Sequence, residues 1–241
     1  MTKMQFDYRD DYANLRGILL SEPAAGRRPG VVLFPDARGI GEHAVECAQR
    51  LVTAGFIVLV ADLYGEGLTA QDMEHAGQLM GDLRADVGRW RGRAEAARRA
   101  LSQQASVDPE KIAVIGYCFG GTTALELARS GASLMAVVSF HGGLASPRPQ
   151  DAARIKAKVL VCHGAADPLV PPAQVAAFER EMMKTGVDWQ MHIYGGAVHA
   201  FTNPAADEAG VPALAYNAAA DRRSWAAMLD LFSEVFGRRT P

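Results

Sequence analysis

One segment of the sequence constrains the fold more than any other: the apolar run 112–115 leads directly into Gly116-Tyr-Cys118-Phe-Gly120-Gly121, and a segment with helical spacing follows. Glycines two residues before and two residues after Cys118 allow a turn from strand to helix so sharp that its central residue is strained. Such a turn lifts the central side chain above the end of a buried strand, as in a nucleophile elbow. We therefore predict that Cys118 is a nucleophile, with the helix dipole favouring its thiolate. The alternative is an inert, buried cysteine in a glycine-rich turn.

Short apolar runs rich in Val, Ile and Leu alternate with segments of helical spacing along most of the chain. The predicted strands are 31–34, 56–61, 112–115, 136–140, 159–162 and 189–194, and the predicted helices are 44–54, 71–104, 122–129, 173–184 and 217–236. This order predicts an α/β fold with a mostly parallel central sheet and helices on both faces. The region 5–20 predicts an antiparallel hairpin or meander. No repeat or long linker interrupts the pattern, so we expect a single domain over residues 1–241.

Composition and charge exclude several classes of protein. The chain has 25 Lys and Arg against 27 Asp and Glu, and a formal net charge of −2 provides no global field to hold nucleic acid or an anionic membrane. No run approaches the roughly 18 apolar residues of a membrane span, and the first residues lack the apolar region of a secretory signal. Three scattered cysteines have neither disulfide nor zinc spacing. We expect a cytoplasmic protein without a metal site.

An elbow nucleophile needs a general base and an acidic partner, and in hydrolases of this kind the acid and then the histidine follow it in the chain. Asp167 lies after the predicted strand 159–162, and His199 lies after the predicted strand 189–194. We expect His199 to take the thiol proton and later to activate water, while Asp167 fixes the imidazole tautomer. A turn aspartate before a proline and an ordinary loop histidine are the alternatives for these two residues.

Two backbone N–H groups are expected to stabilise a negative oxygen during the reaction. One belongs to Phe119, directly after the nucleophile, and the other to Ala37, in the loop after the strand 31–34. The remaining histidines and cysteines are expected to be structural: His163 and His192 within strands, His43 and His75 on helix surfaces, and Cys47 and Cys162 as inert buried thiols. His141 ends the strand 136–140, where a place in the cleft and a structural role both remain open.

A rival motif points to a dinucleotide instead. Gly39-Ile-Gly41-Glu-His-Ala44 matches G-x-G-x-x-A, and Asp62 follows at the end of the next predicted strand. In that fingerprint the glycines close the strand tightly, whereas residues 35–38 intervene here, so we expect no cofactor. Asp62 is then a polar residue that ends a strand.

Taken together, these motifs resemble the dienelactone hydrolase family of the α/β-hydrolase fold over nearly the whole chain. The resemblance rests on the motifs Pro35-Asp36-Ala37-Arg38-Gly39, Asp62-Leu63-Tyr64-Gly65, Gly116-Tyr-Cys118-Phe-Gly120-Gly121, His163-Gly164-x-x-Asp167 and His199-Ala-Phe201. It implies a cofactor-free hydrolase with a Cys118–His199–Asp167 triad that cleaves small lactones or carboxylic esters through an acyl-thioester. The implied partner is a small-molecule substrate, and we expect a monomer or small homo-oligomer. A non-catalytic binding protein on the same fold is the alternative.

Two positions depart from the family pattern. An acidic residue of the family that helps to activate the cysteine is here Asp36, one methylene shorter than the typical glutamate. A family arginine that binds the substrate carboxylate corresponds to Asn203. Arg84, Arg89 and Arg91 are all candidates for the family's other carboxylate-binding arginine.

Overall fold

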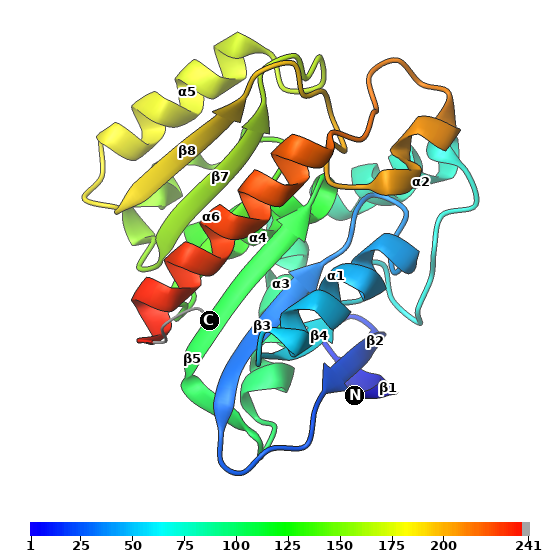
Figure 1. Cartoon of the computed structure of the whole chain (residues 1–241), viewed down its shortest axis with the longest axis vertical. Helices are drawn as coiled ribbons and strands as arrows, with labels where there is room; N and C mark the ends of the chain where they lie inside the picture. The colour runs from blue at the N-terminus through cyan, green and yellow to red at the C-terminus, as the bar shows by residue number, and fades with distance from the viewer. Residues whose placement is uncertain (238–241) are drawn as a thin grey trace.

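Eight strands form one sheet in the computed structural model, which describes residues 1–237 (Figure 1). Four residues of the predicted domain, 238–241, lie outside the described part. In spatial order the strands are β1 (Thr2–Arg9), β2 (Asn14–Ser21), β4 (Ile57–Val60), β3 (Arg28–Phe34), β5 (Val107–Tyr117), β6 (Ala136–Phe140), β7 (Lys158–Gly164) and β8 (Trp189–Tyr194). β1 and β2 form the predicted antiparallel hairpin, and β2 is also antiparallel to β4. All other neighbours are parallel, which confirms the mostly parallel sheet.

Helices cover both faces of this sheet, as predicted from the alternation of strands and helices. They are α1 (Glu42–Thr53), α2 (Met73–Arg84), α3 (Val87–Ser102), α4 (Phe119–Arg129), α5 (Pro172–Met183) and α6 (Ala218–Phe236), with the short 3-10 helices η1 (Pro149–Arg154) and η2 (Pro204–Ala209). Alternate residues of β3 enter different cores: Val32 and Phe34 pack with α3, α4 and α5, whereas Val31 and Leu33 pack with α1 and α6. In Figure 1, α1 and α6 accordingly lie in front of the sheet and α3 and α4 behind it.

The single helix predicted over residues 71–104 is wrong, because the chain breaks between α2 and α3. Asp86 is the N-cap of α3, and its carboxylate accepts the backbone N–H of Arg89 at 3.0 Å. An aspartate in this position satisfies a free amide at the start of a new helix. The uninterrupted helical spacing of the sequence concealed this restart.

β5 begins at Val107, earlier than the predicted strand 112–115, and so includes Asp108 and Pro109. The register between β3 and β5 shifts between the pairs Arg28–Val107 and Gly30–Ile112. A proline lacks the N–H that a regular ladder needs, and such an irregularity accommodates it.

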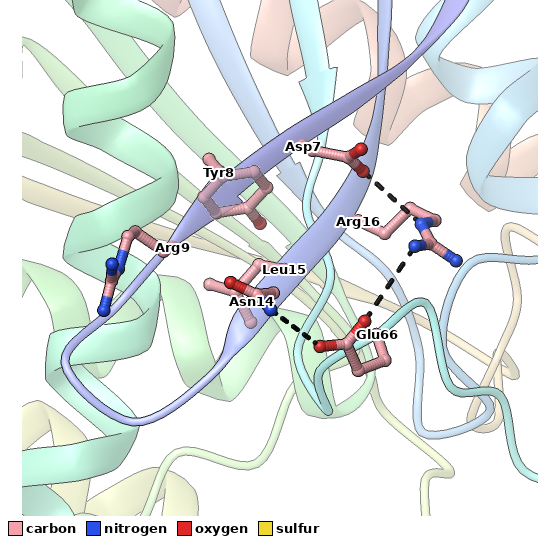
Figure 2. A pocket seen from close by; sticks show the side chains of 7 residues that line it. All are labelled: Asp7, Tyr8, Arg9, Asn14, Leu15, Arg16 and Glu66. Atoms are coloured by element: carbon pink, nitrogen blue, oxygen red, sulfur yellow. Dashed lines mark hydrogen bonds and ion pairs between the residues drawn. The ribbon is translucent and has the colours of Figure 1, made fainter.

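The hairpin edge of the sheet contains a hollow of about 400 Å³ (Figure 2). Three of its charged side chains pair with one another: Arg16 lies 3.4 Å from Asp7 and 3.9 Å from Glu66, and Asn14 donates to Glu66 at 3.1 Å. None of the predicted site residues lines it.

The carboxyl ends of β3, β5, β7 and β8 point toward the top of Figure 1, and the loops that follow them meet there. Parallel strands bring chemistry from distant parts of the chain to one edge in this way. Within residues 1–237, no helix is both long and apolar enough to span a membrane.

Candidate active site

Cys118 stands in the strained turn that the glycines predicted. It is the N-cap of α4, with φ of 53° and ψ of −118°, a left-handed conformation that few side chains adopt. A Cβ on Gly116 would lie 2.0 Å from the carbonyl oxygen of Gly120, and one on Gly120 would lie 2.1 Å from that of Phe34. The two glycines are therefore needed for β5, α4 and the end of β3 to approach one another, with the partly exposed Cys118 at their junction.

The structure brings His199 and Asp167 together. His199 Nδ1 lies 2.7 Å from Asp167 Oδ2, and both residues are buried. Burial disfavours the charged imidazole, but the hydrogen bonds and charges of Asp167 and Cys118 outweigh it and raise the pKa of His199 to about 10. His199 Nε2 is buried and has no hydrogen-bond partner of regular geometry within the described residues. Asp167 therefore holds Nδ1 of His199, and Nε2 remains available to the thiol of Cys118.

Asp167 also holds its own loop. Its Oδ1 accepts the backbone N–H of Leu169 at 2.8 Å, while Oδ2 binds His199. The turn role and the histidine role, which were alternatives in the sequence, are therefore both present in one carboxylate.

The loop after β3 lies against the start of α4. The backbone N–H groups of Ala37 and Phe119 have no hydrogen-bond partner in residues 1–237. The preceding or following amides do donate: that of Arg38 to Asp36, and that of Cys118 to the carbonyl oxygen of Phe140. Tyr64 Oη donates to the carbonyl oxygen of Ala37 at 2.8 Å, and its ring stacks on Phe119 with centroids 6.4 Å apart. Tyr64, which sequence reasoning gave no role, therefore fixes the loop that carries one of the two free amides.

A pocket of about 430 Å³ lies near the turn of Cys118, although Cys118 itself does not line it. Thr122, one helical turn after Cys118, lines it with Arg84, Trp90, Gly143 and Gln174 among others. Arg84 lies over the rings of Phe119 and Trp90, 5.2 and 5.9 Å from their centroids. No carboxylate of residues 1–237 forms an ion pair with Arg84. Its guanidinium is thus available to a ligand in this pocket.

The other two candidate arginines point elsewhere. Arg89 donates to the carbonyl oxygen of Asp82 at the surface, and Arg91 is buried against Glu126 and Asp151. Neither lines the pocket. Of the three candidates left open by the sequence, only Arg84 faces the site.

Asp36 and Asn203 both cap local turns. Asp36 Oδ1 accepts the N–H of Arg38 at 2.8 Å, and Asn203, the N-cap of η2, accepts the N–H of Ala205 at 3.0 Å. These bonds occupy one oxygen of each side chain, and no bond joins either side chain to Cys118 among the described residues.

His43 is not on the helix surface, which corrects the prediction for this residue. Its Nε2 lies 3.1 Å from the carbonyl oxygen of Thr202 and 3.5 Å from Cys47 Sγ, and burial lowers its pKa. Helical spacing alone could not reveal a partner 159 residues away. His141 is buried behind Cys118, and its Nδ1 accepts the Cys118 backbone N–H at 3.2 Å.

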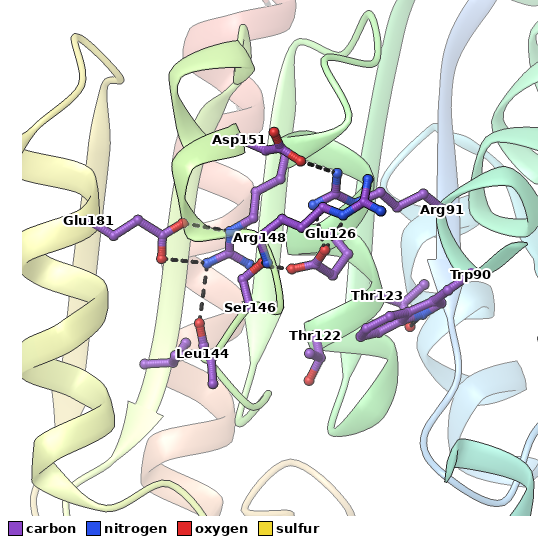
Figure 3. Close-up of polar contacts among 12 residues, drawn as sticks. Trp90, Arg91, Thr122, Thr123, Glu126, Leu144, Ser146, Arg148, Asp151 and Glu181 are labelled. Carbon is purple, nitrogen blue, oxygen red and sulfur yellow. Dashed lines mark hydrogen bonds and ion pairs between the residues drawn. The ribbon is translucent and has the colours of Figure 1, made fainter. Parts of the chain in front are cut away.

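An ion cluster lies behind the pocket (Figure 3). Glu126, fully buried on α4, binds Arg91 at 2.8 Å and Arg129 at 3.0 Å. Arg129 also binds Glu181 at 2.7 Å and donates to the carbonyl oxygen of Leu144 at 3.2 Å. The cluster thus joins α3, α4 and α5 to the loop that forms one wall of the pocket.

The residues that match the dinucleotide motif have structural roles in this protein. α1 begins at Glu42 after the N-cap Gly41, and the loop 35–38 separates these residues from β3. Both oxygens of Asp62 are used by four backbone N–H groups, those of Arg16, Tyr64, Gly65 and Gly67. Among residues 1–237, no group of three or more His, Cys, Asp and Glu side chains is arranged to hold a metal ion.

Known proteins resemble this chain in sequence and in overall structure. A protein named m3DLH has a structure with a TM-score of 0.94 and 48% identity, over 97% of this chain and 98% of its own. A dienelactone hydrolase-like promiscuous phosphotriesterase from metagenomic libraries gives a TM-score of 0.93 and 47% identity over the same shares. A probable 2-oxo-3-(5-oxofuran-2-ylidene)propanoate lactonase of Bradyrhizobium sp is 30% identical over 73% of this chain and 74% of its own. The model of the dienelactone hydrolase family matches residues 15–236, so this chain belongs to that family of hydrolases and has its α/β-hydrolase fold.

Proposed function

We propose that this protein hydrolyses small lactones or carboxylic esters with Cys118 as nucleophile, His199 as general base and acid, and Asp167 as the partner of the imidazole. The observation that carries the proposal is the bond of 2.7 Å between Asp167 and His199, with the free Nε2 of the same ring beside a cysteine in a strained turn. A structural histidine at this depth would be expected to use both of its nitrogens.

The first half of the reaction forms a thioester. His199 Nε2 takes the proton of Cys118, and the thiolate adds to the ester carbonyl carbon. The negative oxygen that develops is stabilised by the backbone N–H groups of Ala37 and Phe119. When the tetrahedral intermediate collapses, the bond to the alkoxide breaks, and His199 gives its proton to that leaving oxygen. In a lactone the leaving oxygen stays attached to the acyl group.

Water completes the cycle. His199 removes a proton from water, the hydroxide adds to the thioester carbonyl, and the sulfur leaves as a thiolate. Asp167 keeps Nε2 available in both halves, because its bond holds the other nitrogen and stabilises the charged ring. The raised pKa of His199 shows that its surroundings stabilise the imidazolium, which is the form of the ring after it has taken the proton of Cys118 or of water.

Arg84 suggests which esters are favoured. It is a cation without an acidic partner in residues 1–237, in a pocket that starts one helical turn from Cys118. A guanidinium in such a place binds a carboxylate well. We propose that preferred substrates carry a carboxylate a few atoms from the scissile carbonyl, as the lactone named for the Bradyrhizobium relative does. Asn203, already engaged as a helix cap, adds no charge to this contact.

Phosphotriester cleavage is the second candidate, because a relative 47% identical over 97% of this chain is named for it. The same groups suit that chemistry: Cys118 attacks phosphorus, the two backbone amides bind the P=O oxygen, and His199 protonates the departing alkoxide or aryloxide. Neutral triesters gain nothing from Arg84, so we expect this activity to be the weaker one.

The test combines a substrate panel with labelling of the thiols. Wild-type protein and Cys118→Ala are assayed with a lactone, p-nitrophenyl esters and a p-nitrophenyl phosphotriester. Burial raises the pKa of Cys47 to about 11 and that of Cys162 to about 12, so iodoacetamide should alkylate Cys118 first and abolish turnover in step.

Two results would contradict the proposal. Activity that survives complete alkylation of Cys118 would remove this residue as nucleophile. A wild-type protein that binds lactones but turns none of the panel over would favour the non-catalytic binding protein.

A further inference from the structure

His141 occupies a strained position behind the nucleophile that the reaction does not explain. It follows β6, is 2% exposed and has a φ of 40°, in the left-handed region that favours glycine. Its backbone N–H donates to the carbonyl oxygen of Cys162 at 2.8 Å, which ties it to β7. A strained backbone at a buried polar residue persists only where the surrounding structure holds it.

The ring of His141 connects two loops. Nδ1 lies 3.2 Å from the backbone nitrogen of Cys118, whose N–H is shared with the carbonyl oxygen of Phe140 at 3.0 Å. Nε2 lies 2.8 Å from the hydroxyl oxygen of Thr202, three residues after His199. One side of the ring therefore contacts the turn that presents the thiol, and the other contacts the loop that carries the imidazole.

These contacts fix the tautomer of His141. Nδ1 accepts from an amide, so it carries no proton, and the proton of the neutral ring is on Nε2, which donates to Thr202. The ionisable rings nearest to it are His199 and His43, with Tyr117 packed at 6.0 Å. Burial, followed by the charges of His199 and His43, lowers the pKa of His141 well below its usual value. The ring stays neutral beside a protonated His199.

His141 also contacts the proposed base directly. Its ring meets that of His199 edge to face, with centroids 5.1 Å apart and planes at 64°. Phe201 packs on it in the same manner, at 5.1 Å and 79°. The rotation of His199 about its bond to Asp167 is therefore limited by a neighbour that is itself held at both ends.

We infer that His141 is a positioning residue, a bridge between the turn of Cys118 and the loop of His199 that sets the separation of the sulfur and the imidazole. The inference rests on the proposed function of those two residues. Nothing in the strand pattern of the sequence required a polar side chain here, and the backbone strain at this residue is offset by the bridge.

Thr202→Val is the sharpest test, since valine keeps the branched shape and removes the hydroxyl that accepts the His141 Nε2 proton at 2.8 Å and also lies 3.4 Å from His43 Nε2. We expect kcat on a p-nitrophenyl ester to fall at least ten-fold with KM within two-fold. The rate of Cys118 alkylation by iodoacetamide, which needs no knowledge of the substrate, should fall by a similar factor. Thr202→Ser restores the hydroxyl and should recover both rates to within three-fold.

Ser224→Ala is the matched control. Ser224 is fully buried on α6, and its hydroxyl donates to the carbonyl oxygen of Asp221 at 3.0 Å, away from the site. If Thr202 has only a structural role, both variants lower the melting temperature and neither changes kcat or the alkylation rate. That result would overturn the inference.

A second variant removes the bridge from the other side. His141→Asn suits the positive φ, because asparagine tolerates the left-handed region, and its shorter amide does not span from the Cys118 amide to Thr202. We expect a folded protein with at least a ten-fold loss of kcat and an altered pH profile. Wild-type kcat in this variant would refute the bridge.

Failure of the proposed function would look different. If Cys118→Ala keeps its activity, the nucleophile is wrong whatever Thr202→Val does. If Cys118→Ala is inactive while Thr202→Val behaves as wild type, the function stands and only the role of His141 fails.

Discussion

Replacing Arg84 by Met tests the proposed substrate class. Methionine keeps most of the length of the side chain and removes the guanidinium, which lies over the rings of Phe119 and Trp90. Since Arg84 has no acidic partner in residues 1–237, the change leaves no buried carboxylate unpaired. Fold stability should therefore change little, and any kinetic effect reports on the ligand.

The expected magnitude follows from the bond that is lost. A hydrogen bond to a charged group contributes about 1.5 to 3 kcal/mol. One decade in kcat/KM corresponds to about 1.4 kcal/mol, so the loss spans about 10- to 100-fold. Arg84 is exposed at the pocket, where water screens its charge, so the lower end of this range applies.

The assay compares two esters with one leaving group: the p-nitrophenyl monoester of succinate, which carries a carboxylate, and p-nitrophenyl butyrate, which does not. Arg84→Met should lower kcat/KM for the first about ten-fold and change the second by less than about three-fold. Arg89→Met is the control, because Arg89 lies on the surface of α3 and does not line the pocket. It should leave the ratio of the two substrates unchanged.

An equal loss on both esters would mean that Arg84 shapes the pocket rather than binding the carboxylate. An unchanged ratio would refute the carboxylate contact altogether and favour neutral substrates, including phosphotriesters.

Three further changes test other parts of the structure. Asp167→Asn removes the carboxylate that helps to raise the pKa of His199 to about 10, so the pKa of His199 measured by NMR should fall and kcat should drop about 10²- to 10⁴-fold. A raised histidine pKa stabilises the fold fully below about pH 6.5 and no longer above about pH 10. The difference in melting temperature between wild type and variant should therefore shrink as the pH rises from about 6.5 to about 10. Glu126→Gln leaves buried arginines uncompensated and should cost about 3 to 5 kcal/mol in urea unfolding, whereas Glu95→Gln, which breaks a partly exposed pair, should cost less than about 1 kcal/mol. Gly120→Ala places a Cβ 2.1 Å from a backbone oxygen and should yield no soluble folded protein; normal yield and activity would contradict the packing described for the turn.

Much of this architecture could be predicted because local patterns determine it. The strand before Cys118, the glycines of the turn and the acid–histidine order place chemistry at one edge of a parallel sheet, and Asp167 does bind His199 there. The strands at 136–140 and 189–194 have the bounds that their apolar runs predicted.

What the sequence concealed depends on long-range contacts. The inward orientation of His43 is decided by Thr202, far along the chain, and the choice of Arg84 over its neighbours depends on how α2 and α3 meet. The break at Asp86 was equally hidden, because one capping side chain ends a helix without disturbing its periodicity. Strand order also follows from how helices pack against the sheet, and no single segment encodes it.

Because of the ion cluster behind the pocket, the two walls of the pocket should differ in how many mutations they tolerate. Arg129 binds Glu126 and donates to the carbonyl oxygen of Leu144, so a change in either charged residue leaves an unpaired charge in the interior, and selection must oppose it. Pro147 and Leu169 line the same pocket with apolar side chains, and Leu169 is 55% exposed. Mutations can accumulate at that rim without disturbing the charges, so proteins with this fold can acquire new substrates while the opposite wall of the pocket stays constant.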